Sequence, residues 1–76
     1  MITFLYIFCP DEDIQSLLDA NDSMANYGVG FTYSTIAPYK FENDEYQIAI
    51  FDNNIVENIK KILAEFGLII VRESFE

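Results

Sequence analysis

The sequence predicts an α+β domain in which strands and helices follow one another as βαββαβ. Three observations carry this prediction: two segments are apolar on both alternating faces, two others repeat apolar residues at helical spacing, and the chain closes with a β-branched run. The 76 residues are too few for two domains, so we expect residues 1–76 to form a single one. With 51% hydrophobic residues, the chain lies outside the composition of disordered proteins.

The chain is predicted to begin with a central strand followed by a helix. Residues 2–9 are apolar on both faces, which is typical of a strand with a neighbour on each side. Pro10 can open a helix, and Asp11–Asp13 would then lie in its first turn, where the helix dipole favours negative charge. The apolar positions at helical spacing are Ile14, Leu17 and Leu18. Met24 could continue this stripe, whereas Asn21, Asp22, Ser23 and Asn26 signal the end of the helix.

Two further strands are predicted in the middle of the chain. Residues 29–36 alternate large side chains with small or polar ones, which indicates an edge strand with one face toward water. Residues 38–45 are polar and acidic, and we expect them to form a connection. Residues 46–51 are again apolar on both faces except at Gln47, so they predict a second central strand.

The last third of the chain predicts a helix and a final strand. Residues 52–54 offer side chains for an N-cap, and Gly67 offers a C-cap. The apolar stripe between them consists of Ile55, Ile59, Ile62, Leu63 and Phe66. Residues 68–71 then predict the last strand. This order is the split βαβ, or ferredoxin-like, arrangement: a four-stranded antiparallel sheet with the first and third strands in its centre and two helices on one face.

The charge of the chain is strongly negative and unevenly distributed. Thirteen Asp and Glu residues face four Lys and Arg residues and no His, which gives a net charge of -9. Eight of the acidic residues and a single lysine precede Tyr46. Affinity for a phosphate backbone rests on cationic side chains, so we expect no direct binding to nucleic acid and favour a basic partner.

The predicted topology would gather acidic residues that are distant in sequence. The end of the first strand, the start of the first helix and the hairpin between the second and third strands share one end of the sheet. The partner-binding residues predicted from this convergence are Asp11, Glu12, Asp13, Glu42, Asp44 and Glu45, with Asp19 and Asp22 extending the surface. Such a cluster would steer a cationic partner. The alternative is that these acids only cap a helix and solvate a loop.

The residue types that carry catalysis or bind cofactors are scarce. The chain has no His, and its one cysteine, Cys9, has no second thiol with which to bind zinc; we expect it to be a small buried side chain. The acidic residues could offer oxygen ligands to calcium or magnesium, but their spacing fits no EF-hand loop. We therefore expect no enzyme, no cofactor and no metal site.

The sequence also predicts a cytoplasmic protein. The apolar start lacks the positive region and the length of a secretory signal. A single cysteine cannot form an internal disulfide. No apolar run approaches the roughly 20 residues that span a bilayer, so we expect no membrane partner.

Aromatic side chains are concentrated on the predicted strands and suggest a second surface. Two helices cover only one face of a four-stranded sheet, so an aromatic open face could bind a partner or a second copy. The residues proposed for this interface are Tyr6, Phe8, Tyr33 and Tyr46. The alternative is that these aromatics belong to the core.

In size, acidity and architecture the chain resembles the small acidic inhibitor proteins that phages make, which include anti-CRISPR proteins and nucleic-acid mimics. The resemblance covers the whole chain in these properties and involves no sequence motif. It implies a non-catalytic protein that occupies the basic surface of a nucleic-acid-binding complex, with carboxylates in place of phosphates. The alternative function is a homo-oligomeric ferredoxin-like module, regulatory or structural, that forms a homodimer or larger assembly through its aromatic sheet face.

Overall fold

The protein is an α+β domain, as the sequence predicts. The computed structural model describes residues 1–25, 36–40 and 43–76, and for residues 36–40 the backbone only. The elements in chain order are β1 (Thr3–Phe8), α1 (Ile14–Ala25), β2 (Ile36–Lys40), β3 (Glu45–Ile50), α2 (Val56–Glu65) and β4 (Ile69–Phe75). Short 3-10 turns, η1 (Asp11–Asp13) and η2 (Asn53–Ile55), lead into the two helices.

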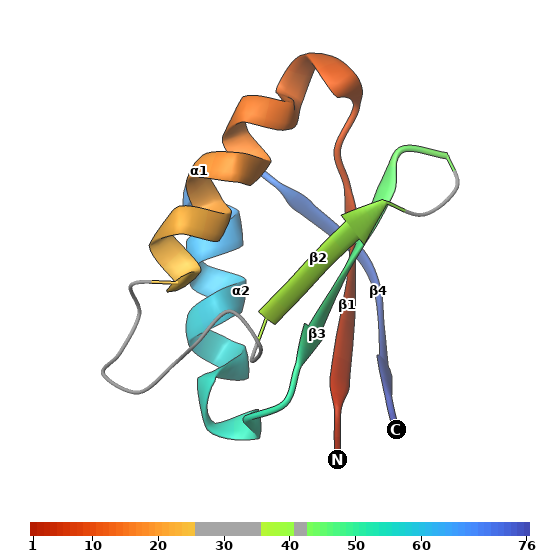
Figure 1. Cartoon of the computed structure of the whole chain (residues 1–76), viewed down its shortest axis with the longest axis vertical. Coiled ribbons are helices and arrows are strands. Elements are labelled where there is room, and N and C mark those ends of the chain that lie inside the picture. The colour runs from red at the N-terminus through yellow and green to blue at the C-terminus, as the bar shows by residue number, and fades with distance from the viewer. Residues whose placement is uncertain (26–35, 41–42) are drawn as a thin grey trace.

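The strands form one antiparallel sheet in the order β2-β3-β1-β4 (Figure 1). β1 therefore lies between β3 and β4, and both of its edges are hydrogen-bonded to neighbouring strands. The first and third strands occupy the centre, as their composition predicts. β4 is a described edge strand, and a bulge in its pairing with β1 falls between Tyr6 and Ile7.

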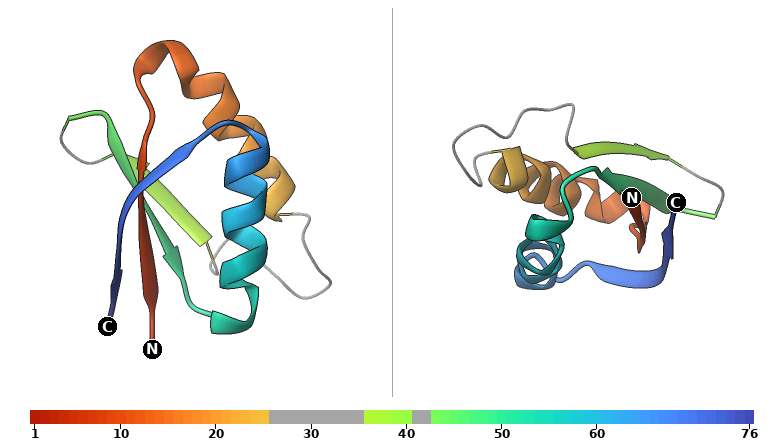
Figure 2. Two further views of the ribbon diagram at one scale, coloured as in Figure 1. Left: turned by 180° about the vertical axis from the view of Figure 1, so that it is seen from behind. Right: turned by 90° about the horizontal axis from the view of Figure 1, so that it is seen from below.

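Both helices lie on the same side of the sheet, and the core fills the space between the two layers (Figure 2). β1 points Leu5 and Ile7 into this space, and both are fully buried. Ile48 of β3 lies opposite Leu5 and is buried as well. α2 contributes Ile59 and Leu63, one helical turn apart and both fully buried. Phe4, Tyr6 and Phe8 consequently point to the other face of the sheet.

α1 continues past the polar residues that signal its end and includes Met24. The polar residues at positions 21–23 were expected to end the helix, yet it continues to Ala25. Ala20 and Met24 add a buried turn after Leu17, and this burial outweighs the turn preference of the polar residues between them. Leu18, assigned to the apolar stripe, is exposed instead. Neither helix of the described part of the chain has the length and apolarity needed to cross a membrane.

The second strand differs from the prediction. The expected strand at residues 29–36 lies outside the described residues except for Ile36, where β2 begins. The expectation that residues 38–45 form only a connection is wrong, because β2 pairs with β3 as far as Lys40. Pro38 lies opposite Ile48 in this pairing. Because β2 is the outer strand, a proline without an N–H group is tolerated there.

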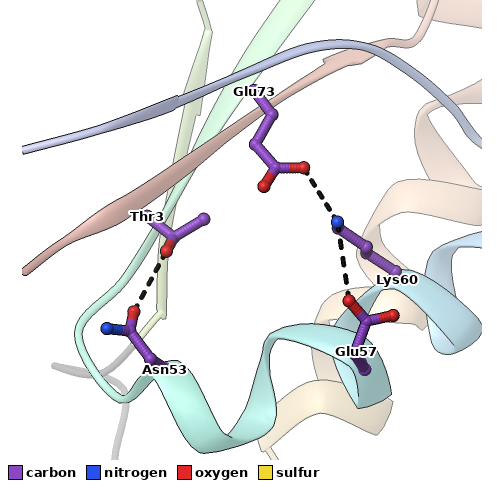
Figure 3. A network of polar contacts seen from close by, with 5 residues as sticks. All are labelled: Thr3, Asn53, Glu57, Lys60 and Glu73. Atoms are coloured by element: carbon purple, nitrogen blue, oxygen red, sulfur yellow. Dashed lines mark hydrogen bonds and ion pairs between the residues drawn. The ribbon is translucent and has the colours of Figure 1, made fainter.

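Polar contacts link α2 and the turn before it to the sheet (Figure 3). The hydroxyl of Thr3 donates a hydrogen bond to Oδ1 of Asn53 at 3.0 Å. Lys60 of α2 lies 2.8 Å from a carboxylate oxygen of Glu73 in β4 and 3.7 Å from one of Glu57. The hydrogen bond with Glu73, helped by the negative charge of both carboxylates, raises the pKa of Lys60.

Candidate functional site

The end of β1 that leads into α1 brings together acidic residues from two distant parts of the sequence. The backbone N–H of Cys9 donates to the carbonyl oxygen of Asp44 at 2.8 Å. Asp44 immediately precedes β3, whereas η1 (Asp11–Asp13) begins two residues after Cys9. The convergence predicted from the topology is thus present for the described residues of the two segments.

Local backbone preferences place each of these acidic residues. Pro10 is extended, with φ -64° and ψ 159°, and its carbonyl accepts from the N–H of Asp13 at 2.8 Å, which closes the 3-10 turn. Asn43 and Asp44 both adopt left-handed conformations, with φ of 59° and 62°. Asn and Asp tolerate this region better than most other non-glycine residues. The backbone of Asp44 therefore forms part of the turn, and its side chain adds a negative charge to the surface.

Burial and the negative charge of these carboxylates affect the pKa of the Cys9 thiol. Burial is the main cause that raises its pKa, followed by the negative charges of Asp13, Asp11, Asp44 and Glu12. The four negative charges that raise this pKa therefore come from two segments of the chain. We call these four residues, Asp11, Glu12, Asp13 and Asp44, the acidic end. The three residues of η1 are exposed and Asp44 is half-buried.

The remaining residues of the predicted acidic surface lie elsewhere or are already paired. Glu45 accepts from an Nη atom of Arg72 in β4 at 3.3 Å, so its charge is partly offset. Asp19 and Asp22 are exposed on α1, and Asp22 lies about 12 Å along the helix from its first residue, at the usual rise per residue. Asp19 accepts from the side chain of Gln15 at 2.9 Å. Glu42 lies outside the described residues.

The open face of the sheet carries a polar network around Tyr6. The amide nitrogen of Gln47 donates to the Tyr6 hydroxyl at 3.0 Å, and the guanidinium of Arg72 lies 4.0 Å from the centre of the Tyr6 ring. Hydrogen bonding with Ser74 and then with Gln47 lowers the pKa of Tyr6, and the charge of Arg72 adds to this effect. Gln47 is only 6% exposed, and among the described residues its Oε1 has no hydrogen-bond donor.

The predicted aromatic interface is only partly on this open face. Tyr6 and Phe8 lie there, and Phe8 is 42% exposed. Tyr46 must be removed from the set, because it lies opposite Ile7 on the helix side and packs against the core. Tyr33 lies outside the described residues. Sequence reasoning missed Ile69, which is 61% exposed and lies opposite Phe8. No signal in the sequence indicated this exposure, because Ile69 belongs to a run of β-branched residues in which every position looks equally apolar.

The described residues offer little for metal or covalent chemistry. No group of three or more His, Cys, Asp or Glu side chains among them is arranged to hold a metal ion. Burial and the negative surroundings both keep Cys9 in its thiol form, which is the weaker nucleophile. The arrangement can attract cations electrostatically, and it can present apolar side chains beside them.

Comparison with protein-family models, with curated proteins and with solved structures finds no match to this chain.

Proposed function

We propose that this chain is a non-catalytic acidic binding protein of ferredoxin-like architecture, which inhibits a nucleic-acid-binding complex by occupying its basic surface. The observation that carries the proposal is the acidic end, where the hydrogen bond from the Cys9 N–H to the Asp44 carbonyl holds acidic residues of two distant segments at the same end of β1. In this role they would take the place of phosphates, as the anti-CRISPR proteins and nucleic-acid mimics of phages do, against Lys and Arg side chains.

The charge distribution supports this proposal. A net charge of -9 on 76 residues exceeds the magnitude of roughly 2 to 8 that suffices for solubility in a small domain. Charges of one sign that gather at one end repel one another and destabilise the compact state. A basic partner would relieve this repulsion on binding, and the same field would speed its approach.

A competitive capture experiment tests the proposal. The tagged protein is incubated with cell lysate at about 50 mM and about 500 mM salt, where exposed charges are strongly screened at the higher concentration. We expect nucleic-acid-binding proteins to be retained at low salt, lost at high salt and displaced by added DNA. The proposal would be overturned if the captured proteins were the same at both salt concentrations and in the presence of added DNA.

Two matched variants assign the binding to the acidic end. Asp13→Asn with Asp44→Asn removes two charges there, and asparagine keeps the left-handed conformation of position 44 accessible. Glu57→Gln with Glu76→Gln removes two charges from exposed positions outside it. We expect capture to fall for the first pair and to persist for the second. Equal losses would show that only net charge matters and would exclude a defined acidic site.

A further inference from the structure

Beside the acidic end, the open face of the sheet presents an exposed apolar pair. Phe8 of β1 lies opposite Ile69 of β4 on one side and opposite Glu45 of β3 on the other. Phe8 is 42% and Ile69 61% exposed. Cross-strand neighbours on one face have Cβ atoms about 5 Å apart, so the two side chains form one continuous patch.

The position of this patch follows from the fold. Phe8 immediately precedes Cys9, whose N–H is bonded to Asp44, so the patch lies at the same end of β1 as the acidic end. Both helices pack on the other face of the sheet (Figure 2). Buried partners such as Leu5 and Ile48 take up the helix side, which leaves Phe8 for the open side. Exposed apolar side chains rimmed by charged ones are typical of protein-binding surfaces.

The charges around the patch indicate what would cover it. A second copy related by a two-fold axis through the patch would bring two acidic ends together, and each chain carries a net charge of -9. Nucleic acid would meet the same repulsion from its phosphates. A positively charged segment with an apolar side chain matches both features, since its cations would face the carboxylates while its apolar group covers Phe8 and Ile69.

We propose that the partner contacts this end of the molecule through a basic amphipathic protein segment, whose apolar side chain is anchored on Phe8 and Ile69. The inference rests on the proposed function and makes it more specific. A pure phosphate mimic would need only the carboxylates, whereas this surface adds an apolar contact that salt does not screen.

Two synthetic peptides of equal charge test the proposal by fluorescence anisotropy. One peptide places leucines at helical spacing on one face and lysines on the other face. The second peptide has serine in place of every leucine. We expect the leucine peptide to bind about tenfold more tightly, and to keep that advantage at high salt, because it covers apolar area that the serine peptide leaves exposed. The Phe8→Ser and Ile69→Ser variants should each remove most of the advantage.

Phe75→Ser is the matched control. Phe75 is 56% exposed but lies opposite Thr3, at the other end of β1. It should leave both affinities unchanged, and thermal unfolding confirms that each variant is folded. Equal binding of the two peptides, or an equal effect of Phe8→Ser and Phe75→Ser, would overturn the apolar anchor and leave the proposed function standing.

Two further outcomes separate the remaining explanations. If neither peptide binds at low salt, the proposed function fails together with the inference. Sedimentation equilibrium of the protein alone tests the second copy as occupant. A dimer that Phe8→Ser dissociates, and that Phe75→Ser does not, would assign the patch to self-association and overturn the proposal of a basic partner.

Discussion

Replacing Gly67 by alanine isolates the free energy of one backbone conformation. Gly67 follows α2 with φ of +74°, and an added Cβ would meet nothing within 4 Å. The N–H of Gly67 donates to the carbonyl of Ala64 and that of Leu68 to Leu63, both at 3.0 Å. This pair of hydrogen bonds is the Schellman motif, and Leu63 and Leu68, the positions that commonly make its apolar contact, are both buried in the core.

The expected cost is conformational only, because the position offers space for the methyl group. A non-glycine residue in the left-handed region costs roughly 1 to 2 kcal/mol. Alanine also restricts the unfolded chain, which returns about 0.4 to 1 kcal/mol. The net loss for Gly67→Ala is therefore about 1 kcal/mol, which corresponds to about 4 to 8 °C in Tm for a domain of this size.

Urea unfolding followed by circular dichroism measures this loss. We expect the midpoint to fall for Gly67→Ala while the dependence on urea concentration stays the same, since the surface exposed on unfolding does not change. Gly67→Asn is the control, because asparagine adopts the left-handed region more readily and should lose less. The reasoning would be refuted if the alanine variant were as stable as the parent, or if the alanine and asparagine variants lost the same stability.

Three further predictions concern the network on the open face, the ion pair of α2 and the core. The phenol of Tyr6 should ionise below its ordinary pKa, so its ionisation adds stability as pH rises from the pKa of the folded state to that of the unfolded state. Arg72→Gln should raise the Tyr6 pKa in a titration of phenolate absorbance, and Tyr6→Phe identifies the signal of this residue. The raised pKa of Lys60 gives stability that is fully present below the Lys60 pKa of the unfolded state and is lost as pH rises through the pKa of the folded state. Glu73→Gln should diminish this loss of stability at alkaline pH, as measured by urea unfolding. Ile59→Ala, at a fully buried position, should cost about 3 kcal/mol in the same assay.

The sequence predicts the elements that are buried on both sides better than those at the edges. β1, β3 and α2 have apolar patterns strong enough to outweigh local signals, and their positions agree with the prediction. The part of β2 from Pro38 to Lys40 was missed because proline is a turn signal in isolation, and its tolerance on an outer strand depends on the sheet order. The end of α1 could not be fixed from the sequence, because Met24 favours continuation, the polar residues at positions 21–23 favour an end, and the burial that decides between them depends on the rest of the fold.

The candidate site shows the same division. The gathering of Asp11–Asp13 with Asp44 could be predicted, because it follows from the order of the strands. Which face of β1 would be covered could not, since Phe4, Tyr6 and Phe8 are as apolar as the residues between them. The pairing of Glu45 with Arg72 depends on the register between three strands, which the pattern of either strand alone leaves open.

The two ends of the described chain are hydrogen-bonded to each other. The N–H of Ile2 donates to the carbonyl of Glu76, and that of Glu76 donates back to Ile2, so β1 and β4 begin and end side by side (Figure 1). A force that pulls the two ends apart would open the β1–β4 ladder one hydrogen bond at a time, like a zipper, instead of shearing all of them together. Such a domain yields to weak traction from its ends, although the acidic end lies at the far side of the sheet, where the ladder would open last.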